Sequence, residues 1–257
     1  MTDFEAIGHQ LAEAIKSSSA DYIEAHLEES QTSHITYRGR ELESIGKTTA
    51  TGGNVRALVK GGWGFVSFND LNELPGKVEL AVKQAQLVGN EESQLAPVEP
   101  VVDIVPSEIA QNPVTMPLAE KKQLLDEYNA LIWHTPKLQT SIIGYGDSHK
   151  KTIFLNSSGS HIEQERMDIT LRLSAVATDG SEVQQTGLSL GSSGDFSLIQ
   201  GLHQRVKLMA QHAVELLSAP QVKGGEYTVV LDPVLAGVFV HEAFGHLSES
   251  DFVYEND

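Results

Sequence analysis

The feature that most constrains the fold is a β-rich stretch between residues 137 and 192. Runs rich in Val, Ile, Thr and Leu follow one another there, separated by short turn signals. These signals are Gly146-Asp147, Asn156 to Gly159, and Asp179-Gly180. Strand-like runs joined by short turns predict an antiparallel sheet made of sequence neighbours.

Helical patterns occur on both sides of this stretch. Apolar residues at helical spacing predict helices over residues 4–17, 71–89, 118–132 and 196–217. Loose alternation predicts strands at 21–29, 33–38 and 41–47. Two apolar runs separated by Gly61-Gly62 predict a hairpin. Together these patterns predict an α+β fold with antiparallel β-meanders and packed helices.

Two segments are expected to connect rather than to pack. Residues 90–116 hold four prolines and show little periodicity, which indicates an extended connector. Residues 218–225 form a short linker with Pro220 and a Gly-Gly pair. After it, YTVVLDP (227–233) is interpreted as a strand, and a helix is expected from Val234 onward.

Composition narrows the possible partners. The chain has 35 acidic and 18 basic residues, a formal charge of −17, which repels phosphate backbones and disfavours nucleic-acid binding. It has no cysteine, so disulfides and cysteine-ligated metals within this chain are excluded. The start lacks a secretory signal, and the apolar run from Val234 to Val240 is too short to span a bilayer. We therefore expect a cytoplasmic protein without membrane contact.

The sequence HEAFGHLSE, from His241 to Glu249, carries a candidate metal site. Its two histidines are five residues apart, which places them about 140° apart around a regular helix. They can face one ion if a π-bulge occurs, or if the helix ends near Phe244 and His246 folds back. Gly245 suits both geometries, because glycine tolerates backbone dihedrals that other residues avoid.

These residue types fit the chemistry of a zinc peptidase. Neutral imidazoles of His241 and His246 are suitable ligands for zinc, and a catalytic zinc takes three protein ligands and one water. The bound water has a lowered pKa, and Glu242 is placed to take its proton as general base. The alternative is a buried apolar helix whose histidines cap its end or form hydrogen bonds at the surface. It would bury Val234, Leu235, Val238, Phe239 and Phe244.

HEAFGHLSESD resembles the H-E-x-x-x-H signature of the TldD/PmbA family of metallopeptidases, in its TldD-like, motif-bearing branch. Further runs fall in family order and extend the resemblance over essentially the whole chain. They are GGNVRALVKGGWGFVSFND, KVELAVKQAQLVG, LAEKKQLLDEYNALI, FLNSSGSHIEQER and GEYTVVLDPVLAGVFVHEAFGH.

The resemblance implies a zinc-dependent peptidase that acts on unfolded or extended peptides. It makes His241 and His246 zinc ligands and Glu242 the general base. It also implies an α+β N-terminal domain, here residues 1–220. Residues 221–257 would begin a β-rich C-terminal metallopeptidase domain. The family forms dimers, so a homo- or hetero-dimer with a TldD/PmbA-type subunit is expected.

The family's third zinc ligand is a cysteine far downstream, and this sequence has none. We therefore expect a truncated copy that binds zinc weakly or not at all and has no peptidase activity alone. The carboxylates after the motif, Glu249, Asp251 or Glu255, could reach a metal in principle. A non-catalytic subunit that binds peptides or a partner is the alternative. Direct action on DNA, suggested by the family's association with DNA gyrase, is disfavoured by the charge.

Overall fold

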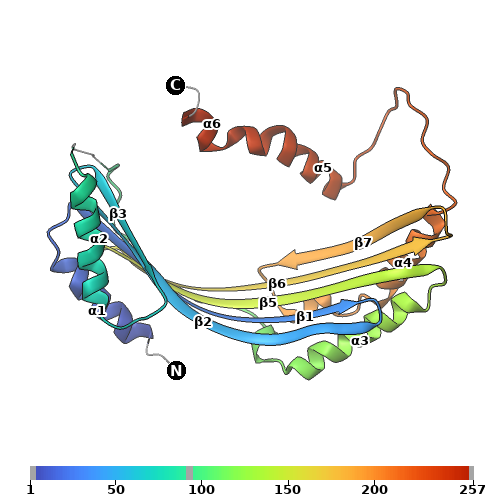
Figure 1. The fold of residues 1–257 in the computed structure, drawn as a ribbon, viewed down its shortest axis with the longest axis horizontal. Helices are drawn as coiled ribbons and strands as arrows, with labels where there is room; N and C mark the ends of the chain where they lie inside the picture. The colour runs from blue at the N-terminus through green and yellow to red at the C-terminus, as the bar shows by residue number, and fades with distance from the viewer. Residues whose placement is uncertain (1–3, 91–94, 255–257) are drawn as a thin grey trace. The chain divides into compact units, whose positions relative to one another are not determined.

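A computed structural model of the chain describes residues 4–90 and 95–254. It divides into two compact units, residues 1–218 and 219–257. The first unit is built on one seven-stranded sheet with the order β3-β2-β1-β5-β6, and both β4 and β7 pair with β6 (Figure 1). All pairings are antiparallel except that of β4 with β6. The predicted α+β architecture is confirmed.

The elements of the first unit follow one another in a helix-sheet-helix order that occurs twice. In chain order they are α1 (Phe4–Lys16), β1 (Tyr22–Arg38), β2 (Glu41–Val59), β3 (Gly62–Phe68), α2 (Leu74–Val88), β4 (Val102–Val105), a 3-10 turn (Pro113–Thr115), α3 (Leu118–Trp133), β5 (Leu138–Asn156), β6 (His161–Thr178), β7 (Val183–Ser192), a 3-10 turn (Phe196–Ile199) and α4 (His203–Leu216).

The strands are longer than the sequence patterns predicted. The two predicted strands at 21–29 and 33–38 are one continuous strand, β1. Its central residues pair with both β2 and β5, so the backbone ladder continues where side-chain alternation is weak. The predicted hairpin joins β2 to β3 through Lys60 and Gly61, which have φ of 47° and 78°. Two consecutive residues with positive φ match the right-handed twist of the flanking strands.

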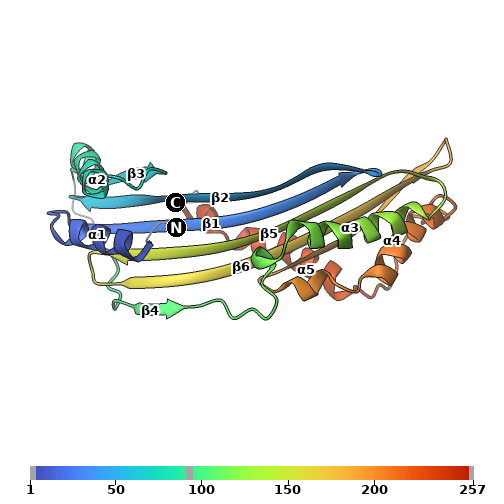
Figure 2. The ribbon, with the colours of Figure 1, turned by 90° about the horizontal axis from the view of Figure 1, so that it is seen from below.

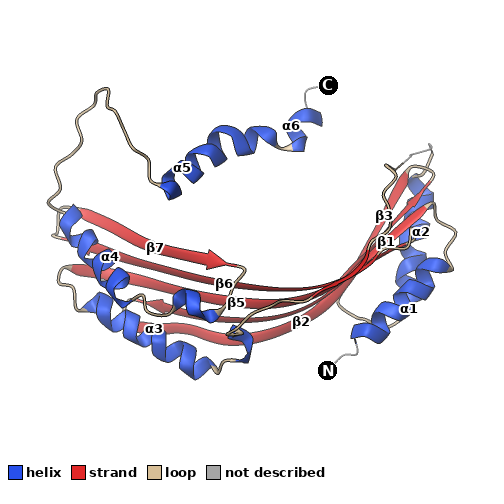
Figure 3. Cartoon of the chain, turned by 180° about the vertical axis from the view of Figure 1, so that it is seen from behind, coloured by secondary structure: helices blue, strands red, loops and turns tan. Residues whose placement is uncertain are grey.

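All four long helices pack on the same face of the sheet (Figures 2 and 3). Odd-numbered residues of β1 point toward them. Ile23 and Leu27 pack with α1 and α2 in one hydrophobic cluster, whereas Ile35 and Tyr37 pack with α3 and α4 in a second. Even-numbered residues of β1 point to the opposite face, which no helix in the described part of this unit covers.

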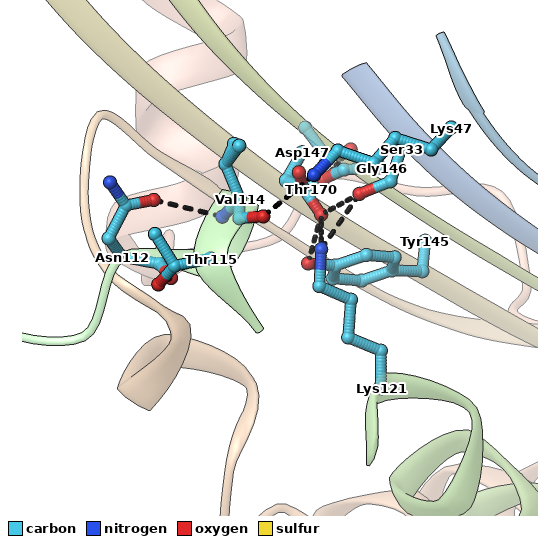
Figure 4. A network of polar contacts seen from close by, with 10 residues as sticks. All are labelled: Ser33, Lys47, Asn112, Val114, Thr115, Lys121, Tyr145, Gly146, Asp147 and Thr170. Atoms are coloured by element: carbon cyan, nitrogen blue, oxygen red, sulfur yellow. Dashed lines mark hydrogen bonds and ion pairs between the residues drawn. The ribbon is translucent and has the colours of Figure 1, made fainter. Parts of the chain in front are cut away.

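A buried polar network connects α3 to the sheet (Figure 4). The Lys121 ammonium lies 2.6 Å from Asp147 Oδ2 and donates to Ser33 Oγ at 2.7 Å. The hydroxyls of Ser33 and Tyr145 both donate to the same Asp147 oxygen at 2.5 Å. Burial lowers the pKa of Lys121, and burial beside Asp147 raises the pKa of Tyr145 well above its usual range.

This network shows that one predicted turn is wrong. Gly146-Asp147 lies in the middle of β5, and Asp147 is only 4% exposed. The turns at Asn156 to Gly159 and at Asp179-Gly180 are confirmed. Glycine followed by aspartate is typical of turns, but here a lysine 26 residues earlier supplies the partner that allows burial.

Two other predictions need correction. The helix predicted at 196–217 is interrupted, because Gly201 has a φ of 69° and separates the 3-10 turn from α4. Residues 227–232, predicted as a strand, have no regular secondary structure. A strand needs a hydrogen-bonded neighbour, and the described residues supply none to this segment. The connector at 90–116 is confirmed where described, apart from the short β4 and a 3-10 turn.

The second unit is a short series of helical turns. It comprises α5 (Pro233–Val240), a π-helical turn (His241–Gly245), a 3-10 turn (His246–Ser248) and α6 (Ser250–Tyr254). None of the helices in the described parts of the chain combines the length and hydrophobicity that crossing a bilayer requires.

Candidate metal centre

Helix α5 presents the candidate site at its carboxyl end. Asp232 caps the helix, because its side chain accepts a hydrogen bond from the backbone N–H of Leu235 at 2.8 Å. Pro233 occupies the first turn, where its missing N–H has no cost. The sequence Asp-Pro therefore fixes where the helix begins, and eight residues later the chain reaches His241.

The apolar side chains of this helix are exposed among the described residues. The five that the alternative interpretation would bury are between 51% and 79% exposed: Val234, Leu235, Val238, Phe239 and Phe244. The residues that the structure describes do not bury this helix. Exposed apolar side chains in a contiguous stretch are typical of a surface that contacts another part of a protein.

A π-helical turn carries the motif, which is the first of the two geometries that the spacing allowed. The backbone N–H of His246 donates to the carbonyl oxygen of His241, five residues earlier. This wider turn brings residues five apart onto one side of the helix. The ring centroids of the two histidines lie 4.4 Å apart, at an interplanar angle of 71°.

Gly245 is not required by backbone geometry. Its φ and ψ are −56° and −54°, which any residue adopts in a helix. A Cβ atom at this position would lie 3.7 Å from His241 Nδ1, an ordinary van der Waals contact. The predicted role of glycine, to adopt unusual dihedrals, is therefore not the one observed.

The motif brings three potential ligand groups together. One nitrogen each from His241 and His246 and a carboxylate oxygen of Glu242 lie within 4.8 Å of one another, and all three residues are exposed. Across residues 4–90 and 95–254, no other group of three His, Asp or Glu side chains converges in this way. The two imidazole nitrogens fit zinc as ligands, and the Glu242 carboxylate beside them fits the predicted general base.

The ring of His246 has a second contact, which the sequence did not indicate. Its Nδ1 lies 2.7 Å from Glu249 Oε1, and both side chains are about half exposed. Glu249 ends the 3-10 turn, with φ of −72° and ψ of 142°. The spacing of three residues was the available signal in the sequence, because residues three apart are neighbours on a helical turn.

The chain is similar to known protein families, sequences and solved structures. The family models described as PmbA/TldA metallopeptidase domain 1 and PmbA/TldA metallopeptidase central domain match residues 24–85 and 111–219. A metalloprotease of Synechocystis sp. is 41% identical over 241 residues, covering 93% of this chain and 52% of that protein. The chain spans about half the length of the relatives that it matches over most of its own length.

Two further relatives extend this comparison. A zinc metalloprotease TldD homologue of Saccharolobus solfataricus is 26% identical over 117 residues, 45% of this chain and 26% of that protein. The crystal structure of TldE from Thermococcus kodakarensis superposes with a TM-score of 0.61 at 17% identity. It covers 81% of this chain and 46% of that one, and shows that the fold is shared. From the two domain matches, this chain belongs to the PmbA/TldD family of metallopeptidases.

Proposed function

We propose that this chain forms part of a zinc-dependent peptidase that hydrolyses unfolded or extended peptides. The observation that carries the proposal is the π turn that brings donor atoms of His241, Glu242 and His246 within 4.8 Å. The names of the relatives support a metal-dependent protease, and one of those names specifies zinc.

In the proposed mechanism, His241 and His246 hold the metal. A bound zinc ion supplies a Lewis acid that polarises the peptide carbonyl and lowers the pKa of a water molecule. Glu242 takes the proton of the attacking water and passes it to the leaving amine. Exposure of all three residues leaves room for a substrate and for a further ligand.

The third protein ligand is proposed to come from outside residues 1–257. The family resemblance implies a cysteine, and the sequence holds none. Two histidines alone leave a zinc ion with fewer protein ligands than catalytic sites use. Residues 1–257 by themselves are accordingly expected to bind zinc weakly and to leave peptides uncut.

We also propose a dimer with a TldD/PmbA-type subunit. The exposed apolar side chains of α5 support a contact with another part of the complete protein or with a partner. A non-catalytic peptide-binding subunit is the alternative to the peptidase. A variant of Glu242 distinguishes the two functions.

Replacing Glu242 by Gln in the complete protein is the test. The variant is expected to retain its zinc and to lose peptide cleavage by roughly 10²- to 10⁴-fold, because proton transfer is removed while the histidines stay. Metal content is measured by mass spectrometry and cleavage with an unstructured peptide. Glu226→Gln, an exposed change in the same unit, is the matched control. Cleavage that is unaffected by E242Q would contradict the proposed mechanism, and absence of cleavage in the unaltered protein would favour the binding subunit.

A further inference from the structure

We propose that Glu249 is a positioning residue that sets the tautomer and orientation of His246 for metal binding. This inference rests on the proposed function, because it concerns how the same site is prepared. It starts from one contact, the 2.7 Å distance between His246 Nδ1 and Glu249 Oε1.

The contact follows from the way the helix ends. After the π turn, residues 246–248 form one 3-10 turn, and the backbone N–H of Glu249 donates to the carbonyl oxygen of His246. Glu249 itself is extended, so the chain leaves the helix there. Its side chain can then reach back three residues to the ring of His246.

The chemistry of the pair decides which nitrogen remains free. A neutral imidazole has one donor and one acceptor nitrogen, and an ionised carboxylate only accepts. The proton of His246 therefore lies on Nδ1, where it is donated to Glu249. The lone pair lies on Nε2, and this nitrogen is the one left to bind a metal. A carboxylate in this place also makes the ring a stronger ligand.

The two histidines of the motif differ in this respect. Among the described residues, the ring of His241 has a contact with the ring of His246 and no hydrogen bond to either nitrogen. Of the two rings, only that of His246 forms a hydrogen bond with a carboxylate in the described residues. The contact thus orients the ring of His246 and leaves that of His241 without an equivalent hydrogen bond in the described residues.

The geometry also separates this role from direct ligation. The converging donor atoms belong to His241, Glu242 and His246; neither Glu249 nor Asp251 is among them, and Glu255 lies outside the described residues. A carboxylate that accepts from Nδ1 lies on the opposite side of the imidazole ring from Nε2. Glu249 therefore acts through His246 and does not fill the third ligand position.

The first experiment needs no metal. The complete protein, labelled with ¹⁵N-histidine and freed of metal, is studied by long-range ¹H–¹⁵N NMR. His246 is expected as the Nδ1–H tautomer in the unaltered protein and mainly as the Nε2–H tautomer in Glu249→Ala. Glu249→Gln keeps an acceptor oxygen, so it is expected to restore part of the Nδ1–H population. An unchanged tautomer in E249A overturns the inference.

The second experiment measures zinc affinity by competition with a chelator. E249A is expected to bind zinc 10- to 100-fold more weakly, with partial recovery in E249Q. Glu226→Gln removes an acidic charge from an exposed position in the same unit and is expected to change zinc affinity less than twofold. An equal loss in E226Q overturns the inference, because general charge would then explain both variants.

Failure of the inference and failure of the proposed function give different results. An unaltered protein that binds no zinc overturns the function, while the NMR result still decides whether Glu249 sets the tautomer. A protein that binds zinc with equal affinity with and without Glu249 retains the function and overturns the inference.

Discussion

The chain contains two clusters of polar side chains with opposite surroundings. The network of Lys121, Asp147 and Ser33 is buried, and its charged groups are paired within the first unit. The group of His241, Glu242 and His246 is exposed, and its donor atoms converge without hydrogen bonds to one another. The first cluster stabilises the fold, because a buried charge must be paired. The second leaves its lone pairs available, which a metal site requires.

The buried and the exposed cluster are expected to differ in how much their variants change the free energy of unfolding. Asp147→Ala is expected to lower it by about 3–5 kcal/mol, because the variant leaves the Lys121 ammonium buried and unpaired. Denaturant titration followed by circular dichroism measures the change. The matched control is Asp168→Ala on β6, whose exposed ion pair with Arg166 is expected to contribute about 0–1 kcal/mol.

A double variant tests whether the unpaired charge of Lys121 causes the loss of stability. Combining D147A with Lys121→Met removes the unpaired charge and is expected to recover part of the lost stability. If D147A lowers the free energy of unfolding no more than D168A does, the buried network does not stabilise the fold.

The second prediction concerns pH. Burial and the hydrogen bond to Asp126 at 2.5 Å raise the pKa of Tyr37 to about 12. The folded state holds this proton more tightly than the unfolded state, whose tyrosine titrates near 10. The contribution to stability is therefore present below pH 10 and is lost as the pH rises from 10 to 12. Its size is about 2–3 kcal/mol for a shift of two pKa units.

Tyr37→Phe isolates this effect from the other titrating groups. The variant is expected to be less stable at pH 8 by about 1 kcal/mol, since it lacks the hydrogen bond. The difference between the two proteins should shrink and then change sign between pH 10 and 12, because only the protein with Tyr37 loses stability through this residue, by more than the initial difference of about 1 kcal/mol. A difference in stability that stays constant over that range would show that the pKa of Tyr37 is not raised by folding.

The smallest effect on stability is expected at the metal site. Replacing both His241 and His246 by Ala should change the free energy of unfolding of the metal-free chain by less than about 0.5 kcal/mol, because both side chains are exposed. In the complete protein the same double variant should lose its zinc, measured by mass spectrometry. A stability loss above 1 kcal/mol would instead support histidines that cap the helix.

The same contrast explains what the sequence could predict. The metal motif is local, since its three residues lie within six positions, and its five-residue spacing predicted either a π-bulge or an early end of the helix. The buried network is not local: Ser33 and Asp147 are 114 residues apart. Local turn chemistry at Gly146-Asp147 therefore gave the wrong structure, because it could not include a partner on another helix.

The prediction of secondary structure was limited in the same way, because it used only local sequence. Periodicity located α1, α2 and α3 to within a few residues, because each buries a stripe of its own side chains. It divided β1 in two, because the middle of that strand shows little alternation in burial. Residues 227–232 have β-forming side chains but no neighbouring strand among the described residues. Strand formation depends on pairing, which one segment of sequence does not contain.

Strand β1 takes part in both hydrophobic clusters, and this limits how the gene can change in length. Leu27 belongs to the cluster with α1 and α2, and Ile35 to the cluster with α3 and α4. Both point to the same face because an even number of positions, eight, separates them. Inserting or deleting one codon between them would move the side chains at one end of the strand to the opposite face of the sheet, unless a β-bulge accommodated the change. Length variation in this segment should therefore come in steps of two codons.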